Sequence, residues 1–529
     1  MKFEFPLIIG IVAGAILTCL FCALVSRRLM GILQQEGYSG KALIKWLFRR
    51  GNVQRRRLSL LALSLLLLTA LFNVSFSFVP APWPNVIALA PYAGLYGLYL
   101  FSEKHYALKV AVKPTARLVR LSAVHTVLLA VLSAGLGFAL AAISLAVDGH
   151  WMYLLRFVPF AAFPLLLPFT VYCAGGIAKI YEIPHTRGFV RRAEKTLQEH
   201  PCVKVGITGS FGKTSVKHLT AQLLSGHTRV QATPASYNTP VGIAKCVNDG
   251  LDCDVFLAEM GARKVGDIAE LCDMVKPTVG IVTGVCAQHL ETFKSLENIK
   301  AEKGVLAKRT DKVVLGRTAA DMKKVGALVE GEDFAAEDVE LFEDGTSFTL
   351  RIGGERAAVK TKLLGRHIAE DIALSAALCS VLGMTLQEIA DMVPSLSPVP
   401  HRLERLEGNG AVILDDSYNS NVEGAKDAVE VLKLFEGSKF IVTPGLVELG
   451  ALEEEANAAL GASLVGLDRV ILVGETLVLP VRRGYLEGGG AEEKLSVVPT
   501  LAAAQEILAK ELKTGDAVLF LNDLPDKYI

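Results

Sequence analysis

A glycine-rich loop between an apolar segment and a helical one is the clearest chemical feature of the sequence. Residues 203–208 are mostly apolar and predict a short buried strand, and residues 216–224 have helical spacing. The segment between them contains Gly209, Gly212, Lys213 and Thr214. A glycine loop between strand and helix brings backbone N–H groups and a helix N-terminus to a polyphosphate. In such a loop the lysine reaches the β- and γ-phosphates and the threonine hydroxyl binds Mg²⁺, so the loop predicts an ATP site.

The loop is a variant of the usual phosphate-binding pattern. Ile207 stands where the strict GxxxxGK[ST] pattern has its first glycine, which leaves TGSxGKT. A chance glycine-rich turn is the alternative, but the flanking strand and helix favour a nucleotide site. The loop residues predicted to bind the nucleotide are Thr208, Gly209, Ser210, Gly212, Lys213, Thr214 and Ser215.

Two further residues with metal-binding side chains follow apolar segments. Glu259 ends the apolar run 255–258, and His289 follows the run 279–282 after a short turn. Ligands of open α/β sheets bind at the carboxyl ends of the strands, where the Glu259 carboxylate is expected to lie. A solvated glutamate and a structural histidine are the alternatives at these positions.

Seven segments, in this order, resemble motifs of the Mur ligase family, the ATP-dependent amide-forming enzymes of peptidoglycan precursor synthesis. They are TGSFGKT at 208–214, SYNTPVG at 236–242, EMGA at 259–262, AQHLE at 287–291 with Lys303-Gly304 downstream, GRH at 365–367, PHRLE at 400–404 and DDSYNSN at 415–421. The resemblance extends from about residue 200 to the end of the chain. The EMGA and DDSYNSN segments favour the MurF-type branch, the UDP-N-acetylmuramoyl-tripeptide:D-alanyl-D-alanine ligases.

The resemblance implies a role for each matching residue. It implies one Mg²⁺ held by Thr214 and Glu259, and a second Mg²⁺ held by His289 and by Lys303 once that lysine is carbamylated, with Lys300 as the competing lysine. Arg402 is expected to contact the ATP phosphates, and Lys213, His289, Lys303 and Arg402 form the expected catalytic set. The resemblance also implies nucleotide contacts from Asp371 and Asp416, and substrate contacts from Asn238, Tyr418, Asn419 and Asn421.

The implied reaction joins a carboxylate to an amine through an acyl phosphate made with ATP and Mg²⁺. We expect the acid to be a carboxylate-bearing cell-envelope precursor, carried by a soluble or a lipid carrier, and the amine to be an amino acid or a dipeptide. A polymerising ligase similar to poly-γ-glutamate synthetases is one alternative, and an ATP-driven membrane transporter is another. The transporter alternative predicts functional polar groups within the apolar helices, of which Arg156 and His125 are the only examples that the sequence offers.

Three features depart from the family pattern. The UDP-sugar domain of the family is replaced by an apolar segment. Ile368 and Asp371 stand where the family has asparagines that contact adenine, although an aspartate still accepts a hydrogen bond from the adenine amino group. The KGSR-type segment near the MurF C-terminus is absent, so the contacts with the incoming amine are expected to differ.

Charge divides the 529 residues into two regions of opposite sign. Residues 1–176 contain 16 Lys and Arg against 4 Asp and Glu, which leaves 39 against 50 for residues 177–529. The composition, 51% hydrophobic and 21% charged, excludes a disordered chain, and nine scattered cysteines show no disulfide framework. A basic, apolar region followed by an acidic one predicts a lipid bilayer as a partner and argues against nucleic acid.

Five apolar stretches have the length that a bilayer requires, namely 5–26, 58–79, 85–102, 122–147 and 152–176. Segments 27–57 and 103–121 contain nine and five basic residues, whereas 80–84 and 148–151 contain none. The positive-inside rule therefore predicts a multi-pass protein of the plasma (inner) membrane, with its N-terminus outside and the catalytic domains in the cytoplasm.

These observations predict a multi-domain chain. Residues 1–180 are expected to form an all-α transmembrane bundle, and residues 181–200 a basic, partly helical connector. We expect residues 201–400 to form an α/β P-loop central domain with a mostly parallel sheet, strands at 203–208, 255–259, 279–283 and 312–315, and a hairpin at 340–362. Residues 401–529 are expected to form an α/β Rossmann-like C-terminal domain, with strands at 411–415, 439–443, 469–473 and 517–521. The proline-containing segment 394–404 is the expected hinge between these two domains.

Overall fold

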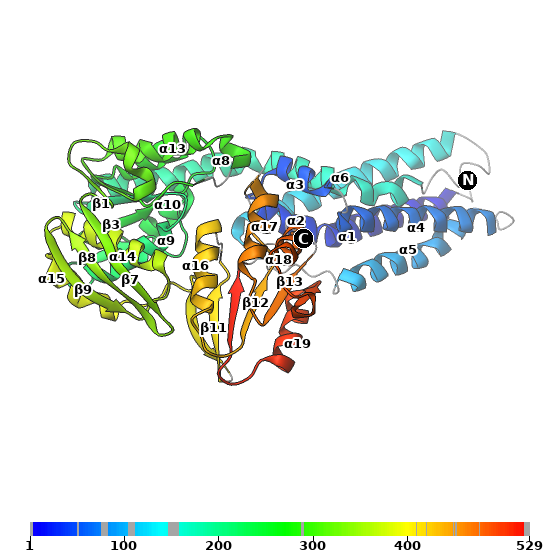
Figure 1. The fold of residues 1–529 in the computed structure, drawn as a ribbon. Helices are drawn as coiled ribbons and strands as arrows, with labels where there is room; N and C mark the ends of the chain where they lie inside the picture. The colour runs from blue at the N-terminus through cyan, green and yellow to red at the C-terminus, as the bar shows by residue number, and fades with distance from the viewer. Residues whose placement is uncertain are drawn as a thin grey trace. The chain divides into compact units, whose positions relative to one another are not determined.

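A computed structural model gives the fold of the protein (Figure 1). The structure describes residues 4–49, 52–75, 83–103, 112–146, 158–286, 290–408, 410–418, 421–447, 449, 452–474 and 477–522. The chain divides into two compact units, one up to His185 and one over Thr186–Asp523.

The first unit is helical. Its elements are α1 (Glu4–Val25), α2 (Arg27–Gln35), α3 (Gly40–Leu47), α4 (Val53–Ser75), α5 (Trp83–Ser102), α6 (Ala116–Ala146), η2 (Phe163–Leu166) and the first part of α8 (Leu167–Glu199). Helix α1 packs against α5 and α6, and α4 packs against α5. Buried leucines such as Leu29, Leu65 and Leu129 form the interior of the unit, whereas Leu67, Val131 and Phe138 are exposed. A helical unit with apolar side chains on both its interior and its outer surface is typical of a membrane environment.

Three helical stretches in the described part of the chain are long and apolar enough to cross a bilayer, namely Ile8–Gln35, Ala116–Ile143 and Val158–Glu199. They overlap the first, fourth and fifth predicted spans. The second and third predicted spans coincide largely with helices α4 and α5. Arg156 lies outside the described residues. The five-span topology and its orientation therefore stay predictions.

The predicted connector belongs to one long helix. Helix α8 runs without a break from Leu167 to Glu199, so the segment expected to be partly helical is helical throughout. Pro184 lies inside this helix, one residue before the end of the first unit. The predicted domain boundaries at 180, 200 and 400 stay predictions.

The second unit begins with a six-stranded parallel sheet in the order β2-β3-β1-β4-β5-β6. Its strands are β1 (Val203–Thr208), β2 (Val230–Ala232), β3 (Val255–Glu259), β4 (Val279–Val282), β5 (Lys312–Leu315) and β6 (Ala327–Val329). The alternation of side chains along each strand supplies apolar groups to both faces of the sheet. Val205 and Ile207 belong to one apolar core, and Phe256 and Ala258 belong to the other. A parallel sheet buried on both faces explains why these strands read as continuous apolar runs.

Helices cover both faces of this sheet. One core contains side chains from α9 (Lys213–Leu224) and α14 (Arg366–Val381), which pack against each other. The other contains side chains from α10 (Pro240–Asn248), α11 (Asp267–Val275), α13 (Leu296–Arg309) and the end of α8. The remaining helical elements of this region are α12 (Leu290–Phe293), η3 (Arg317–Met322), α15 (Leu386–Met392) and η4 (Val393–Ser395).

The predicted hairpin is part of a three-stranded antiparallel sheet. Strands β7 (Phe334–Phe342), β8 (Gly345–Ile352) and β9 (Glu355–Thr361) pair in chain order. Phe334, Phe348 and Leu350 pack into the core that contains α14. The extra strand β7 is buried only at its start and is partly buried or exposed beyond it, so it lacks the continuous apolar run of the central strands.

The C-terminal part contains a second six-stranded sheet in the order β10-β11-β15-β12-β13-β14, in which only β10 is antiparallel. Its strands are β10 (Glu404–Gly408), β11 (Ala411–Asp416), β12 (Lys439–Thr443), β13 (Arg469–Val473), β14 (Leu495–Val498) and β15 (Ala517–Leu521). Helices α16 (Val422–Leu432), α17 (Glu453–Ser463) and α18 (Val478–Glu487) contribute to one core, and α19 (Leu501–Glu511) contributes to the other. Figure 1 shows α16 and α19 on opposite sides of this sheet, and η6 (Glu492–Lys494) precedes β14. The α/β architecture predicted for both parts of the second unit is confirmed.

Candidate active site

A cavity of about 1030 Å³ lies between the two sheets of the second unit. Its lining includes residues that are far apart in the sequence but were predicted to act together. These are Gly209, Ser210, Gly212, Lys213, Thr214, Ser215, Asn238, Glu259, Lys303, Asp371, Arg402, Asp416, Tyr418 and Asn421. The fold therefore brings the predicted nucleotide, metal and substrate residues to one place.

The phosphate loop connects β1 to α9 and needs glycine for its shape. Gly212 has φ +73° and precedes the first residue of α9, and a Cβ there would lie 2.7 Å from an Asp371 carboxylate oxygen. The Lys213 ammonium donates to the carbonyls of Gly209 (2.8 Å) and Ser210 (3.0 Å). Burial lowers the pKa of Lys213, which Glu259 opposes and Arg402 reinforces. The loop thus holds a desolvated cation at the helix N-terminus, where phosphate oxygens would replace its carbonyl partners.

Glu259 ends β3 and lies at the centre of a hydrogen-bond network. One carboxylate oxygen accepts from the Thr214 hydroxyl (3.0 Å) and the Lys217 ammonium (2.9 Å), and the other accepts from the Asn238 amide (3.1 Å). Glu259 is 1% exposed and Lys217 is 3% exposed, so their ion pair is fully buried. The paired hydroxyl and carboxylate oxygens of Thr214 and Glu259 are the hard oxygen donors that Mg²⁺ prefers.

Lys303 is the lysine of α13 that reaches the cavity. It is 3% exposed, whereas Lys300 pairs with Asp321 at the surface, 2.8 Å away. Burial, reinforced by the charge of Lys213, lowers the pKa of Lys303 to about 7. Lys303 is one of the buried residues of α13, together with Ile299 and Leu306. A neutral amine is the form that reacts with CO₂, so this environment favours a carbamate at Lys303 over Lys300.

Asp371 lies on α14 beside the phosphate loop. Burial raises the pKa of Asp371 to about 7, and Glu370 also favours protonation, although His367 opposes it. A protonated carboxyl group donates one hydrogen bond and accepts another, as a carboxamide does. The aspartate is therefore compatible with the nucleobase contact that the resemblance assigns to an asparagine.

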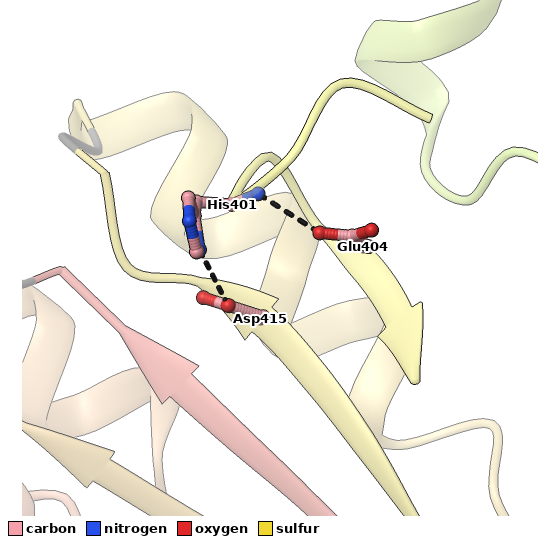
Figure 2. A group of neighbouring side chains, drawn as sticks. All are labelled: His401, Glu404 and Asp415. Carbon is pink, nitrogen blue, oxygen red and sulfur yellow. Dashed lines mark hydrogen bonds and ion pairs between the residues drawn. The ribbon is translucent and has the colours of Figure 1, made fainter. Parts of the chain in front are cut away.

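Arg402 reaches the cavity from the segment that joins the two parts of the second unit. Its guanidinium carbon lies 4.5 Å from the centre of the Tyr418 ring. The preceding residue, His401, is held by Asp415 and Glu404, as Figure 2 shows. The Tyr418 hydroxyl donates to Ser236 Oγ (2.7 Å), which connects the C-terminal part to the loop before α10.

Other residues predicted for the site make contacts within the protein or lie outside the described residues. Thr208 is fully buried, donates to the carbonyl of Met260 and does not line the cavity. The Asn421 side chain caps α16 by accepting from the N–H of Gly424 (2.8 Å). Asp416 accepts from the N–H of Leu403 (3.2 Å). His289 and Asn419 lie outside the described residues. The roles predicted for all of these residues stay predictions.

The sequence did not predict Lys217, which pairs with Glu259, or two of the residues that line the cavity. Lys217 lies one helical turn after Lys213, so its spacing from the loop could have identified it. Arg317 and Glu330 line the cavity from the ends of β5 and β6, and no local pattern marks them.

An ion pair also connects the two parts of the second unit across the cavity. His367 of α14 contacts Asp427 of α16, which also accepts from the N–H groups of Arg366 and His367. Burial lowers the pKa of His367, but Asp427, with smaller contributions from Asp371 and Asp416, outweighs burial and raises this pKa to about 9. Burial also disfavours the Asp427 carboxylate, yet the His367 contact leaves the pKa of Asp427 below its ordinary value.

We expect this ion pair to make folding stability depend on pH in the alkaline range. The ordinary pKa of histidine is 6.5, so the pair stabilises fully below that pH and its contribution is lost as pH rises through about 9. The Asp427→Asn variant should lose about 1 kcal/mol at pH 7, a modest amount because the His367 side chain is 36% exposed. Thermal unfolding at pH 7 and pH 10 measures this effect. An equal loss on alkalinisation in Asp427→Asn and in the unmodified protein would contradict the assignment.

Comparison with known families identifies two regions. Residues 207–379 match the family described as "Mur ligase middle domain", and residues 401–522 match "Mur ligase, glutamate ligase domain". Among curated proteins, the chain is 31% identical over 297 residues to the UDP-N-acetylmuramoyl-tripeptide–D-alanyl-D-alanine ligase of Escherichia coli K12. That match covers 53% of this chain and 66% of the relative. The Bacillus subtilis enzyme of the same name is 27% identical over 299 residues, which cover 54% of this chain and 65% of the relative. The chain spans just under two thirds of the length of these two relatives.

Among solved structures, the chain is also similar to Mur ligases. MurF from Thermotoga maritima in complex with ADP is 27% identical, with a TM-score of 0.57 over 64% of this chain and 80% of that structure. MurF from Acinetobacter baumannii has a TM-score of 0.58 at 21% identity, covering 64% of this chain and 77% of that structure, and at this identity it supports the fold alone.

Proposed function

Because residues 207–522 of this chain belong to the Mur ligase family, we propose that it is a membrane-anchored, ATP-dependent ligase that joins a carboxylate to an amine. The observation that supports this most strongly is the convergence of Lys213, Glu259, Lys303 and Arg402 on one cavity. A phosphate loop with its lysine, oxygen donors for Mg²⁺ and an arginine that stabilises phosphate charge are what an enzyme needs to make an acyl phosphate.

The residues fit Mg²⁺ and ATP. Thr214 and Glu259 would hold one Mg²⁺, and His289 with Lys303 as a carbamate would hold a second. Mg²⁺ there would neutralise phosphate charge. The phosphate loop and Lys213 would bind the phosphates. The ADP in the Thermotoga maritima structure supports a nucleotide at the matching place in this chain. Asp371 and Asp416 would contact the nucleoside.

The proposed reaction has two steps. A carboxylate oxygen of the acid attacks the γ-phosphorus, ADP leaves, and an acyl phosphate forms. The amine nitrogen then attacks the acyl carbon, an amine proton is lost, and inorganic phosphate leaves. Lys213 and Arg402 would stabilise the charge of the transferring phosphoryl group, while Asn238, Tyr418, Asn419 and Asn421 would position the acid and the amine.

The relatives suggest the substrate class. Their names specify a UDP-linked muramoyl tripeptide and D-alanyl-D-alanine. We propose that this chain acts on a related cell-envelope precursor and an amino acid or dipeptide, and that a lipid-linked carrier is among the acceptors to test. The proposal of a membrane anchor rests on the three long apolar helical stretches and their exposed apolar side chains. The distribution of basic residues supports a cytoplasmic location of the catalytic domains.

Substrate-dependent ATP turnover by the detergent-solubilised protein tests this function. The protein would be supplied with Mg²⁺, ATP, UDP-linked or lipid-linked muramoyl peptides and candidate amines, with the product masses measured. We expect phosphate release only when acid and amine are both present, together with a product lighter by one water than the sum of the two. Repeated addition of one amino acid would instead indicate a polymerising ligase. ATP hydrolysis that needs neither substrate would contradict the proposal.

A further inference from the structure

The backbone on both sides of Arg402 has a conformation that side chains disfavour. His401 has φ +63° and Leu403 has φ +45°, which places both in the left-handed region. Each such residue costs about 1 kcal/mol when it is not glycine. A conformation of this kind persists only where surrounding contacts impose it.

Three contacts hold His401, and they come from three different segments; Figure 2 shows the two with Glu404 and Asp415. Its ring Nδ1 lies 2.7 Å from an Asp415 carboxylate oxygen at the end of β11. Its backbone N–H donates to the Glu404 carboxylate (3.1 Å), and its carbonyl accepts from the N–H of Tyr418 (3.3 Å). His401 is therefore tied to the start of β10, the end of β11 and the loop that follows β11.

The same contacts determine where the Arg402 side chain goes. The Arg402 N–H donates to the carbonyl of Val399 (3.1 Å), and the next N–H, that of Leu403, donates to Asp416 (3.2 Å). Because the backbone is fixed before and after it, the Arg402 side chain leaves the chain in one direction, over the Tyr418 ring and into the cavity.

We propose that His401 is a positioning residue that orients Arg402 toward the transferring phosphoryl group through its contact with Asp415. The proposal rests on the proposed ligase function for the role of Arg402. The His401, Glu404 and Asp415 side chains also lie close enough together to suggest a cation site, since their ligand atoms are within 4.8 Å of one another. Hydrogen bonds already connect His401 to both carboxylates, which favours a structural role.

The His401→Gly variant separates the ring from the backbone conformation, because glycine adopts positive φ without strain. We expect hydrogen exchange at the Leu403 and Tyr418 amides to accelerate about tenfold or more, since the segment loses its anchor. We expect kcat to fall about tenfold while the KM for ATP changes less than about twofold. A misdirected Arg402 weakens stabilisation of the transition state more than it weakens nucleotide binding.

Lys276→Gly is the matched control. Lys276 has φ +50° at the end of α11, is exposed and does not line the cavity, so this variant should leave all three quantities unchanged.

A double-mutant cycle with Arg402→Ala tests whether His401 acts through Arg402. If it does, His401→Gly has no further effect on kcat in the Arg402→Ala background. The proposal would be overturned if the losses of kcat in the two variants were additive, or if amide exchange were unchanged in His401→Gly. Mn²⁺ binding that needs no nucleotide and disappears in His401→Gly would also overturn it. Absence of ATP turnover in the unmodified protein would refute the ligase function, whereas amide exchange, measured without nucleotide, would still decide whether His401 fixes this segment.

Discussion

Replacing Lys213 with alanine is expected to lower substrate-dependent ATP turnover by about a hundred- to a thousandfold. The Lys213 ammonium is held by the Gly209 and Ser210 carbonyls, which keeps it at the N-terminus of α9. Burial lowers the pKa of Lys213, and an incoming polyphosphate would favour its charged form. Removal of a single such group from a phosphate-transfer or oxyanion site costs about a hundred- to a thousandfold in rate. Phosphate release under saturating acid, amine and ATP measures the effect.

Lys264→Ala is the appropriate control for this prediction. Lys264 also carries a positive charge and follows the cavity-lining residue Arg263, but its side chain is 78% exposed and pairs loosely with Asp267. The control should retain the turnover of the unmodified protein, because an exposed ion pair contributes little. Turnover that survives Lys213→Ala within about threefold, with the fold intact by circular dichroism, would remove the phosphate loop from the reaction.

Replacing Lys303 with alanine is expected to lower turnover by about a thousandfold, and added acetate or formate should restore part of it. Lys303 is buried at the cavity, and its lowered pKa favours the neutral amine that forms a carbamate. A carbamate is an anion that donates oxygen ligands. In Lys303→Ala, a small carboxylate could occupy the space left by the side chain and replace the carbamate oxygens near the metal ion. The measurement is turnover against acetate or formate concentration, together with the mass of the unmodified protein kept in bicarbonate.

Lys300→Ala provides the matched comparison, since Lys300 lies one turn earlier on the same helix and pairs with Asp321 at the surface. We expect this variant to retain full turnover and to show no response to small carboxylates. If Lys300→Ala were the inactive variant, or if Lys303→Arg kept full activity, the carbamate assignment to Lys303 would be wrong.

The sequence predicted the central strands well because they are buried on both faces. Strands at 203–208, 255–259 and 312–315 have the predicted bounds, and each is a short run rich in β-branched or other apolar residues. Strands β2, β6, β10 and β14 were missed. They are at the edges of their sheets and have only three to five residues, so their sequences carry little periodic signal.

The sequence predicted which residues form the site better than it predicted their burial and their contacts. The glycine loop, Glu259 and Arg402 stand in ordered motifs, so resemblance located them, and the structure brings them to one cavity. The burial of Lys303 and its distinction from Lys300 depend on which side of α13 faces β4, and helical spacing alone does not determine that. The left-handed backbone at His401 likewise depends on a contact with Asp415, fourteen residues away in the chain.

The measurement that tests the central claim most directly follows oxygen from the acid to phosphate. The acid substrate would be labelled with ¹⁸O in its carboxylate and incubated with the protein, Mg²⁺, ATP and the amine, and the released phosphate would be analysed by mass spectrometry. Formation of an acyl phosphate predicts ADP as the nucleotide product and one ¹⁸O atom in each phosphate, transferred from the carboxylate. Unlabelled phosphate, or AMP and pyrophosphate in place of ADP and phosphate, would contradict the account.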